Sequence, residues 1–205
     1  MVSEAMNAAR QSRAQTKAQT RQSLLSSARE VFLSVGYHGA TLDQIAAKAG
    51  FTKGALYWHF PNKQAIFLAL IADAIENNLS ILDRLLDPEI SDPDAVKERL
   101  GRWIDGIDAR EVLPSFGVEL EIEARHDPSF RALHQTLIGK HEAALAEFLG
   151  RYFEAIGEVP RMPIDELAST LITIFKGFAL VRQNRPDYAA TSAPVTKMLL
   201  NIADS

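Results

Sequence analysis

The sequence predicts an all-α protein of about nine helices. Apolar residues recur at helical spacing along almost the whole chain, and the alternation of apolar and polar residues that marks a strand is almost absent. Of the 205 residues, 47% are hydrophobic and 23% are charged, a globular balance that excludes a wholly disordered chain. We expect a flexible basic arm over residues 1–16, a small domain over residues 17–63 and a larger helical domain over residues 64–205.

Composition excludes several kinds of site and location. The chain has no cysteine, so a disulfide framework, a thiolate metal site and a cysteine nucleophile are all impossible. The longest unbroken apolar run is residues 65–72, whereas a helix needs about 20 apolar residues to span a bilayer. The N-terminal residues lack the apolar segment of a secretory signal. We therefore expect a soluble cytoplasmic protein with no membrane partner.

The net charge of −4 conceals an uneven distribution. Residues 1–63 carry eight basic and three acidic side chains, a balance of +5, and the remaining 142 residues carry −9. A basic segment joined to an acidic body indicates that the first meets a polyanion while the second has another role. A chance fluctuation with a solvated basic tail is the alternative.

The first helix is expected to follow the arm. Residues 1–16 have no sustained apolar period and are rich in Ala, Gln, Ser and Arg, which is typical of a flexible segment. From about Lys17, apolar residues recur at helical spacing. Gly36 is a natural left-handed stop for this helix.

Three helices are expected next. Thr41 and Gln44 fit a capping box, in which each side chain satisfies a backbone N–H of the other residue. The short helix that they open ends at Gly50. Thr52 caps a second short helix, and a long helix covers about residues 63–86.

Five more helices are expected in the acidic body. The spacing predicts helices over residues 93–110, 114–126, 128–156 and 164–184, and a last helix from Ser192 to about residue 202. Asp127 is the expected N-cap of the third, with Pro128 as its first helical residue.

The segment 41–63, TLDQIAAKAGFTKGALYWHFPNK, carries the strongest functional signal. Two short helices joined by a tight turn at Gly50 form a helix-turn-helix unit, whose second helix lies in the DNA major groove. An ordinary helical hairpin with a buried aromatic cluster is the alternative. That alternative does not easily explain Tyr57, Trp58 and His59, because three neighbouring side chains cannot all face one core.

Residues 24–70 resemble the N-terminal DNA-binding domain of TetR-type transcriptional regulators. The matching pattern is Gly36-Tyr37, then Thr41-x-x-x-Ile45-Ala46-x-x-Ala49-Gly50, then Thr52-Lys53-Gly54-x-x-Tyr57-x-His59-Phe60-x-x-Lys63. The resemblance implies a three-helix DNA-binding domain, a larger helical domain for ligand binding and dimerisation, and repression relieved by a small molecule. The rest of the chain matches only in length and helix count.

The resemblance also implies which side chains meet DNA. Phosphate contacts fall to Thr41, Tyr57, His59 and Lys63. The residues nearest the bases are Thr52, Lys53, Gly54, Ala55 and Trp58. Lysine can donate to guanine, and a methyl group or a ring can contact the thymine methyl. The basic residues Arg10, Arg13, Lys17 and Arg21 either add minor-groove or phosphate contacts or form a tail that contributes little.

In the body, the resemblance implies an effector pocket and a dimer interface. The apolar pocket candidates are Trp103, Ile107, Phe116, Leu120, Leu137, Phe148, Phe175 and Phe178, and the polar ones are Glu119, His134 and Gln183. The last two helices resemble the family's dimer-forming pair, with the candidates Leu167, Leu171, Ile174, Val195, Met198, Leu199 and Ile202. Ordinary core packing is the alternative for each apolar residue.

A metal site is the rival chemical interpretation. Glu119, Glu123 and His126 share a helical face, and the last two have the spacing of a di-iron ligand pair. Such a site needs two Glu-x-x-His pairs and two further glutamates, and the sequence has no second pair. His134 and His141 share a face without a neighbouring ligand set. We therefore expect no metal, no cofactor and no catalytic residue.

These observations together predict a homodimeric repressor that a small, mainly apolar effector releases from a palindromic DNA operator. Two alternatives stay open. One is an activator or constitutive DNA-binding regulator whose C-terminal domain binds a protein. The more remote one is a helical carboxylate-metal enzyme.

Overall fold

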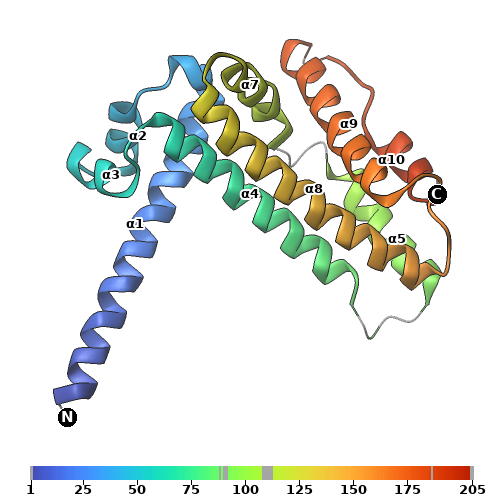
Figure 1. The fold of residues 1–205 in the computed structure, drawn as a ribbon, viewed down its shortest axis with the longest axis horizontal. Coiled ribbons are helices and arrows are strands. Elements are labelled where there is room, and N and C mark those ends of the chain that lie inside the picture. The colour runs from blue at the N-terminus through green and yellow to red at the C-terminus, as the bar shows by residue number, and fades with distance from the viewer. Residues whose placement is uncertain (1, 88, 90–91, 108–112, 186, 204–205) are drawn as a thin grey trace. The chain divides into compact units, whose positions relative to one another are not determined.

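The computed structural model describes residues 2–87, 89, 92–107, 113–185 and 187–203, with side chains from residue 15 onward apart from 113–115, 183 and 184. Its helices are α1 (Val2–Gly39), α2 (Leu42–Ala49), α3 (Lys53–His59), α4 (Lys63–Leu85), α5 (Pro93–Asp105), α7 (Leu113–His126), α8 (Pro128–Ile156), α9 (Ile164–Asn184) and α10 (Ala193–Leu199) (Figure 1). The described residues form helices and no strand, so the predicted all-α class is confirmed. The chain forms two compact units, Met1–Ile71 and Ala72–Ser205, and α4 supplies residues to both.

α1 differs from the predicted first helix at both ends. It begins at Val2 rather than near Lys17, so the segment expected as an arm has a helical backbone. Gly36 has the expected positive φ of 73°, but its ψ of 172° is extended rather than left-handed helical. The chain therefore kinks at Gly36, and the helix ends at Gly39.

The core of the first unit takes apolar side chains from four helices. The buried residues include Leu24, Leu25, Ala28 and Phe32 of α1, Ile45 and Ala46 of α2, Leu56 of α3, and Ile66, Phe67 and Leu70 of α4. The ring centroid of Phe67 lies 5.0 Å from that of Phe32 and 4.6 Å from that of Tyr37. Full burial of one such side chain stabilises the fold by about 1.5–3 kcal/mol, so these contacts fix the start of α4 to α1.

Local caps fix α2 and α3 as the sequence predicts. The backbone N–H of Gln44 donates to Thr41 Oγ1 at 3.2 Å, and the backbone N–H of Thr41 donates to Gln44 Oε1 at 2.9 Å. Gly50 ends α2 in the left-handed conformation, with φ 73° and ψ 23°. Thr52 Oγ1 accepts the backbone N–H of Ala55 at 3.2 Å and starts α3. The predicted capping box and turn are therefore confirmed.

α4 is long and apolar enough, by length and composition alone, to cross a membrane. Its buried side chains have partners in the protein, however. Ile66 and Phe67 lie in the core of the first unit, and Ile75 and Leu82 are buried in the second. α4 is therefore a core helix of each unit.

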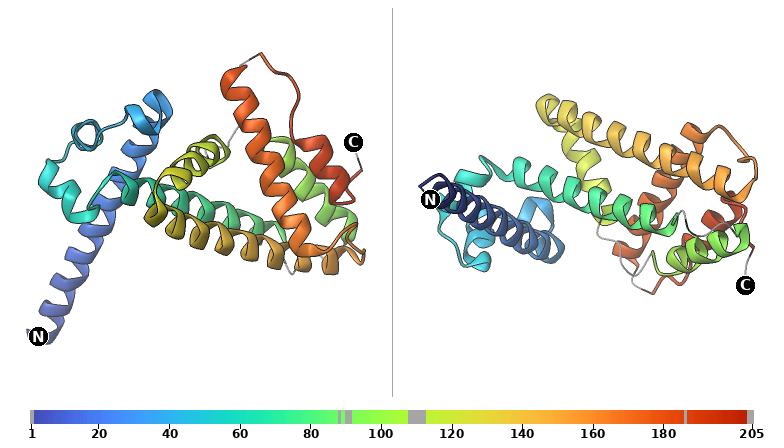
Figure 2. Two further views of the ribbon diagram at one scale, coloured as in Figure 1. Left: turned by 45° about the horizontal axis from the view of Figure 1, so that its top comes forward. Right: turned by 90° about the horizontal axis from the view of Figure 1, so that it is seen from below.

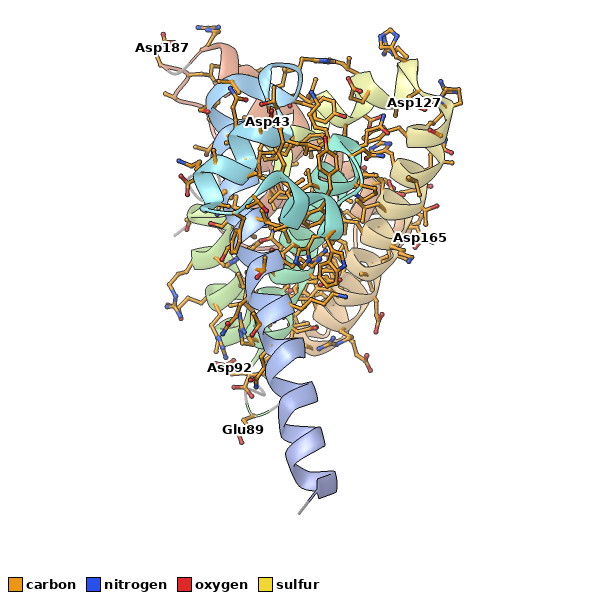
Figure 3. All side chains as sticks on the ribbon, turned by 90° about the vertical axis from the view of Figure 1, so that its left-hand side faces the viewer. Asp43, Glu89, Asp92, Asp127, Asp165 and Asp187 are labelled. Atoms are coloured by element: carbon orange, nitrogen blue, oxygen red, sulfur yellow. The ribbon has the colours of Figure 1, made fainter. Side chains whose placement is uncertain are left out.

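In the second unit, α9 packs on both α7 and α8, and α10 lies beside α5 (Figure 2). Asp127 stands at the start of α8 (Figure 3). Its Oδ1 accepts the backbone N–H groups of Ser129 at 2.8 Å and Phe130 at 3.2 Å. Pro128 is the first helical residue, as the sequence predicts. α10 ends at Leu199, about three residues earlier than expected.

Four residues predicted at a dimer interface lie in the core of the second unit instead. They are Leu167, Leu171, Leu199 and Ile202, each at most 9% exposed. An apolar stripe predicts that a helix face is buried but not what buries it, and here the chain itself covers these four. Of the other candidates, Ile174 and Val195 are half-buried, and Met198 is 55% exposed.

Candidate nucleic-acid interface

One face of α3 is exposed, while its buried anchor, Leu56 and Phe60, holds the helix to the protein. Leu56 is 0% and Phe60 is 3% exposed, so both belong to the core of the first unit. The other predicted contacts on this helix and its cap are exposed or half-buried: Thr52, Lys53, Gly54, Ala55, Tyr57, Trp58 and His59. Tyr57 is 51% exposed and Trp58 is 66% exposed. A short helix that shows hydrogen-bonding and aromatic side chains together suits a major groove, where base edges offer both kinds of contact.

Thr41 is exposed, but its hydroxyl is already used by the protein. Its Oγ1 accepts the Gln44 N–H and donates to Gln44 Oε1 at 3.1 Å. A phosphate contact from Thr41 therefore competes with the side-chain part of the capping box. Thr52 Oγ1 also caps its helix, while its own O–H has no such partner among the described contacts.

Two lysines near this face are paired with acids. Lys53 forms an ion pair with Asp43 of α2, and both side chains remain more than half exposed. Lys48 Nζ lies 2.8 Å from a Glu30 carboxylate oxygen. Exposed pairs of this kind contribute at most about 1 kcal/mol, so Lys53 can exchange Asp43 for an acceptor on DNA at little cost.

Lys63, predicted to contact a phosphate, is engaged by the protein itself. Its Nζ donates to the carbonyl oxygens of Tyr37 at 2.8 Å, Ala40 at 3.2 Å and His38 at 3.4 Å. It also lies 4.5 Å from the centroid of the Tyr37 ring. An ammonium group has three donors, and here three carbonyl oxygens take them all. Lys63 therefore fastens the start of α4 to the end of α1, and the predicted phosphate contact would compete with these hydrogen bonds.

Two basic residues of α1 lie against the C-terminal part of α3. Lys17 Nζ is 4.5 Å from the centroid of a Trp58 ring, and Arg21 Cζ is 5.5 Å from that of Phe60. Sequence reasoning did not link α1 to Trp58, because these residues are 41 positions apart and only the folded unit joins them. Their four-residue spacing was the one available signal that Lys17 and Arg21 share a helix face.

The pKa of the His59 imidazole is lowered from its ordinary value. Burial removes water from the charged ring, and the positive charges of Lys17 and Arg21 add to the effect. The lowered pKa favours the neutral form of His59, which offers one N–H donor and one acceptor nitrogen.

The predicted effector-pocket residues differ in how deeply they are buried. Phe116, Leu120 and Ile107 are buried, while Trp103, Glu119, Leu137, Phe175 and Phe178 are half-buried, and the Gln183 side chain lies outside the described residues. Phe148 is buried in the core of the second unit. A groove of about 480 Å³ runs between α7 and α8, lined by Glu121, Ala124, Arg125, Arg131, His134, Gln135, Ile138, Gly139 and Glu142. Only His134 belongs to both sets.

The lining of the groove between α7 and α8 is held in place by polar contacts. Arg131 donates from Nε to the carbonyl of Ala124 at 2.7 Å and from Nη2 to that of Arg125 at 3.0 Å. Glu121 Oε1 lies 2.8 Å from Lys176 Nζ and 3.7 Å from His134 Nε2. Burial lowers the pKa of His134, the Glu121 carboxylate opposes this shift, and Lys176 adds to it. The groove therefore joins fixed charges to a buried imidazole that is largely neutral.

The rival metal site has no support in the described part of the chain. Glu123 is half-buried and His126 is exposed at the end of α7. No group of three or more His, Asp or Glu side chains among the described residues is arranged to hold a metal ion.

The chain is similar to known bacterial regulators. Residues 24–70 match the model of "Bacterial regulatory proteins, tetR family". A stretch of 64 residues is 50% identical to the uncharacterized HTH-type transcriptional regulator TtgW of Pseudomonas putida and covers 31% of this chain. The chain spans only about half of that relative, because the match takes in 47% of its length.

Two further likenesses extend over most of the chain. The HTH-type transcriptional repressor AcnR of Corynebacterium diphtheriae is 30% identical over 171 residues, which are 77% of this chain and 78% of that protein. The crystal structure of the transcriptional regulator FadR from Bacillus subtilis in complex with stearoyl-CoA has a TM-score of 0.64 and 17% identity, with 88% of this chain and 95% of that chain covered. At that identity the structural likeness shows the fold alone.

Proposed function

We propose, from the premise that this chain belongs to the TetR family of bacterial regulatory proteins, that it is a homodimeric transcriptional repressor with two ligands, operator DNA and a small effector. Membership of this family makes the chain a DNA-binding transcriptional regulator. The observation that carries the proposal is the exposed face of α3 on its buried anchor of Leu56 and Phe60. The protein acts in the cytoplasm, where the operator is.

α3 enters the major groove of the operator. The residues that lie nearest the bases are Thr52, Lys53, Gly54, Ala55 and Trp58, and the residues at the phosphates are Thr41, Tyr57 and His59. Gly54 has no side chain, so its backbone can approach DNA closely. The protein itself does not require glycine there, because an added Cβ would meet only Thr52 Oγ1, at 3.9 Å. Phosphate contacts set the register of the helix on the duplex, and base contacts select the sequence.

Two copies pair through the exposed face of α9 and through α10. Ile174 is half-buried, and Val181, seven residues later on the same face, is 36% exposed. Met198 of α10 is 55% exposed. Exposed apolar side chains on these helices favour a two-fold interface in which each copy offers the same patch. A two-fold dimer requires a palindromic operator with half-sites about one helical turn, or a multiple of it, apart.

The effector binds in the groove between α7 and α8. A volume of about 480 Å³ suits a small organic molecule. Charged side chains line much of this groove, which favours an effector with polar groups over the mainly apolar one that the sequence predicts. Effector binding favours a state that cannot hold DNA, with a coupling of about 1–3 kcal/mol, and by reciprocity operator DNA lowers effector affinity by the same factor. α4 is the helix that has residues in both units and transmits this coupling.

Fluorescence-anisotropy titration with the DNA upstream of the neighbouring genes tests the DNA-binding proposal. Wild-type protein binds one duplex tightly, and Trp58→Ala binds it at least 10-fold more weakly, while Val159→Ala, a change at an exposed loop residue, keeps wild-type affinity. Equal affinity of all three proteins for this duplex would show that α3 does not bind the operator. Deleting the gene raises transcription from that promoter for a repressor and lowers it for the alternative, an activator.

A further inference from the structure

Over residues 15–23, α1 contributes almost nothing to the core of the first unit. α1 has 38 residues, and from residue 15, where the description of its side chains begins, the first buried one is Leu24. Residues 15–23 are exposed apart from the half-buried Thr20. The helix also continues past α2 and α3 (Figures 1 and 3). Since a helix without a packed face is marginally stable in water, this segment needs an external partner to stay helical.

The basic residues of this segment fall on one face of the helix. Arg10, Arg13, Lys17 and Arg21 are spaced by three, four and four residues, which keeps them within about a quarter of the helix circumference. Glu4 is the single acidic residue before Arg21. The remaining positions are mostly Ala, Gln, Ser and Thr, so the helix has no large apolar face of the kind that membrane-surface helices bury. The charge pattern therefore fits a polyanion in water.

The known contacts place this basic stripe next to α3. Lys17 lies over the Trp58 ring and Arg21 over the Phe60 ring, at 4.5 and 5.5 Å. Both residues also lower the pKa of His59, so their charges are close to the phosphate-facing end of the proposed reader. The stripe is thus continuous with the exposed face of α3.

We propose that the outer turns of α1 form a second DNA-binding element, in which Arg10, Arg13 and Lys17 bind phosphates of the duplex that flanks the half-site read by α3. This inference rests on the proposed DNA-binding function. The eleven residue steps from Arg21 back to Arg10 span roughly 16 Å of helix at 1.5 Å per residue, which corresponds to about five base pairs. The DNA phosphates supply the partner that the exposed helix needs, so binding and completion of the helix occur together.

The test uses the full chain and two variants. In the first, Arg10→Gln, Arg13→Gln and Lys17→Gln remove the stripe. In the second, Gln11→Arg, Gln15→Arg and Gln19→Arg are added to those changes, which restores the net charge on the opposite helix face. The first variant therefore tests the charge, and the second tests the face that carries it.

Affinity for a 30-base-pair random-sequence duplex is measured from 50 to 200 mM NaCl. Loss of three phosphate contacts lowers the slope of log affinity against log salt by about 2.7, so the wild type loses about 40-fold more affinity over this range than the first variant. The second variant keeps the low slope. The inference is overturned if the first variant keeps the wild-type salt slope, or if the second variant regains it. Either result leaves the proposed DNA-binding function unaffected.

A second measurement uses an operator selected from a random library by the wild-type chain. Trimming about six base pairs from each flank of this duplex weakens the wild type and leaves the first variant unchanged. Equal sensitivity of both proteins to trimming overturns the inference. Failure of the wild type to bind any duplex overturns the proposed function, and this inference with it.

Discussion

The side-chain ammonium of Lys63 donates to the carbonyl oxygen of Tyr37 at 2.8 Å, across 26 positions of the sequence. With the carbonyls of His38 and Ala40 it closes the corner between α1 and α2. Lys63→Ala leaves these acceptors without their charged donor and lowers the free energy of unfolding by about 1–3 kcal/mol, as urea denaturation will show. The salt slope of DNA binding stays unchanged. A slope lower by about one unit at unaltered stability would return Lys63 to the phosphate contacts.

Replacement of Lys53, in contrast, is expected to change DNA recognition and to leave stability nearly unchanged. Its ion pair with Asp43 is exposed, so Lys53→Ala changes the free energy of unfolding by less than about 1 kcal/mol. On DNA the same change relaxes base preference at one position of each half-site, by about 1–3 kcal/mol. Titration against operators substituted at each position measures this preference. A uniform loss of affinity over all of them shows that Lys53 contacts a phosphate instead.

His141 links stability to pH. Burial, together with the positive charge of Lys176, lowers the pKa of this imidazole to about 4, whereas its unfolded value is about 6.5. Between these values the unfolded chain binds the additional proton, so the free energy of unfolding falls as pH drops from about 6.5 to 4. His141→Gln removes up to about 3 kcal/mol of this decrease. Urea denaturation at pH 7 and pH 4.5 checks it, with His126→Gln, a change at an exposed histidine, as the control.

The groove between α7 and α8 can be filled without disturbing the helix. A Cβ added at Gly139 meets nothing within 4 Å, and the same holds for Gly150 on the same helix outside the groove. Leucine at either position raises helix propensity by close to 1 kcal/mol. Gly139→Leu then excludes the effector, whereas Gly150→Leu does not. Native mass spectrometry of proteins purified from cells shows the bound mass in the wild type and Gly150→Leu alone. A bound mass in Gly139→Leu contradicts the assignment.

Substitutions at the proposed dimer interface are expected to differ in effect from a substitution in the core of the second unit. Val181→Asp and Met198→Asp yield folded monomers that bind the operator weakly, because a charge enters an apolar contact between copies. Leu171→Asp unfolds the second unit instead, since Leu171 is 2% exposed. Sedimentation velocity and circular dichroism distinguish the two outcomes. Val159→Asp, at a loop residue that is 83% exposed, serves as the control. Dimers of both Val181→Asp and Met198→Asp at micromolar concentration refute this interface.

The accuracy of sequence reasoning followed the range of the interaction concerned. Thr41 with Gln44, and Asp127 with Pro128, act within one helical turn, so residue types and spacing were sufficient to predict both helix starts. Leu171 shows the limit, because a helical stripe has the same pattern whether its own chain or a second copy covers it.

Lys63 and the groove between α7 and α8 mark the same limit at the candidate sites. The lysine's acceptors lie 23 to 26 residues away, and the groove exists only where faces of two helices meet. Spacing within one helix carries no information about either. The exposed face of α3 was predictable because neighbouring aromatic residues cannot share one core.

α4 joins the two units without a loop, and this sets a rule for altering the chain. Ile66 and Phe67 on one side of Ile71, and Ile75 and Leu82 on the other, must each meet their own core. Every residue added between them turns the later part of the helix by about 100°, since a turn holds 3.6 residues. An insertion of one or two residues at Ile71 therefore turns one unit relative to the other by about 100° or 200°, whereas seven residues nearly restore the helical phase. The first unit of one related regulator can therefore be joined to the second unit of another only at a junction that keeps this helical phase.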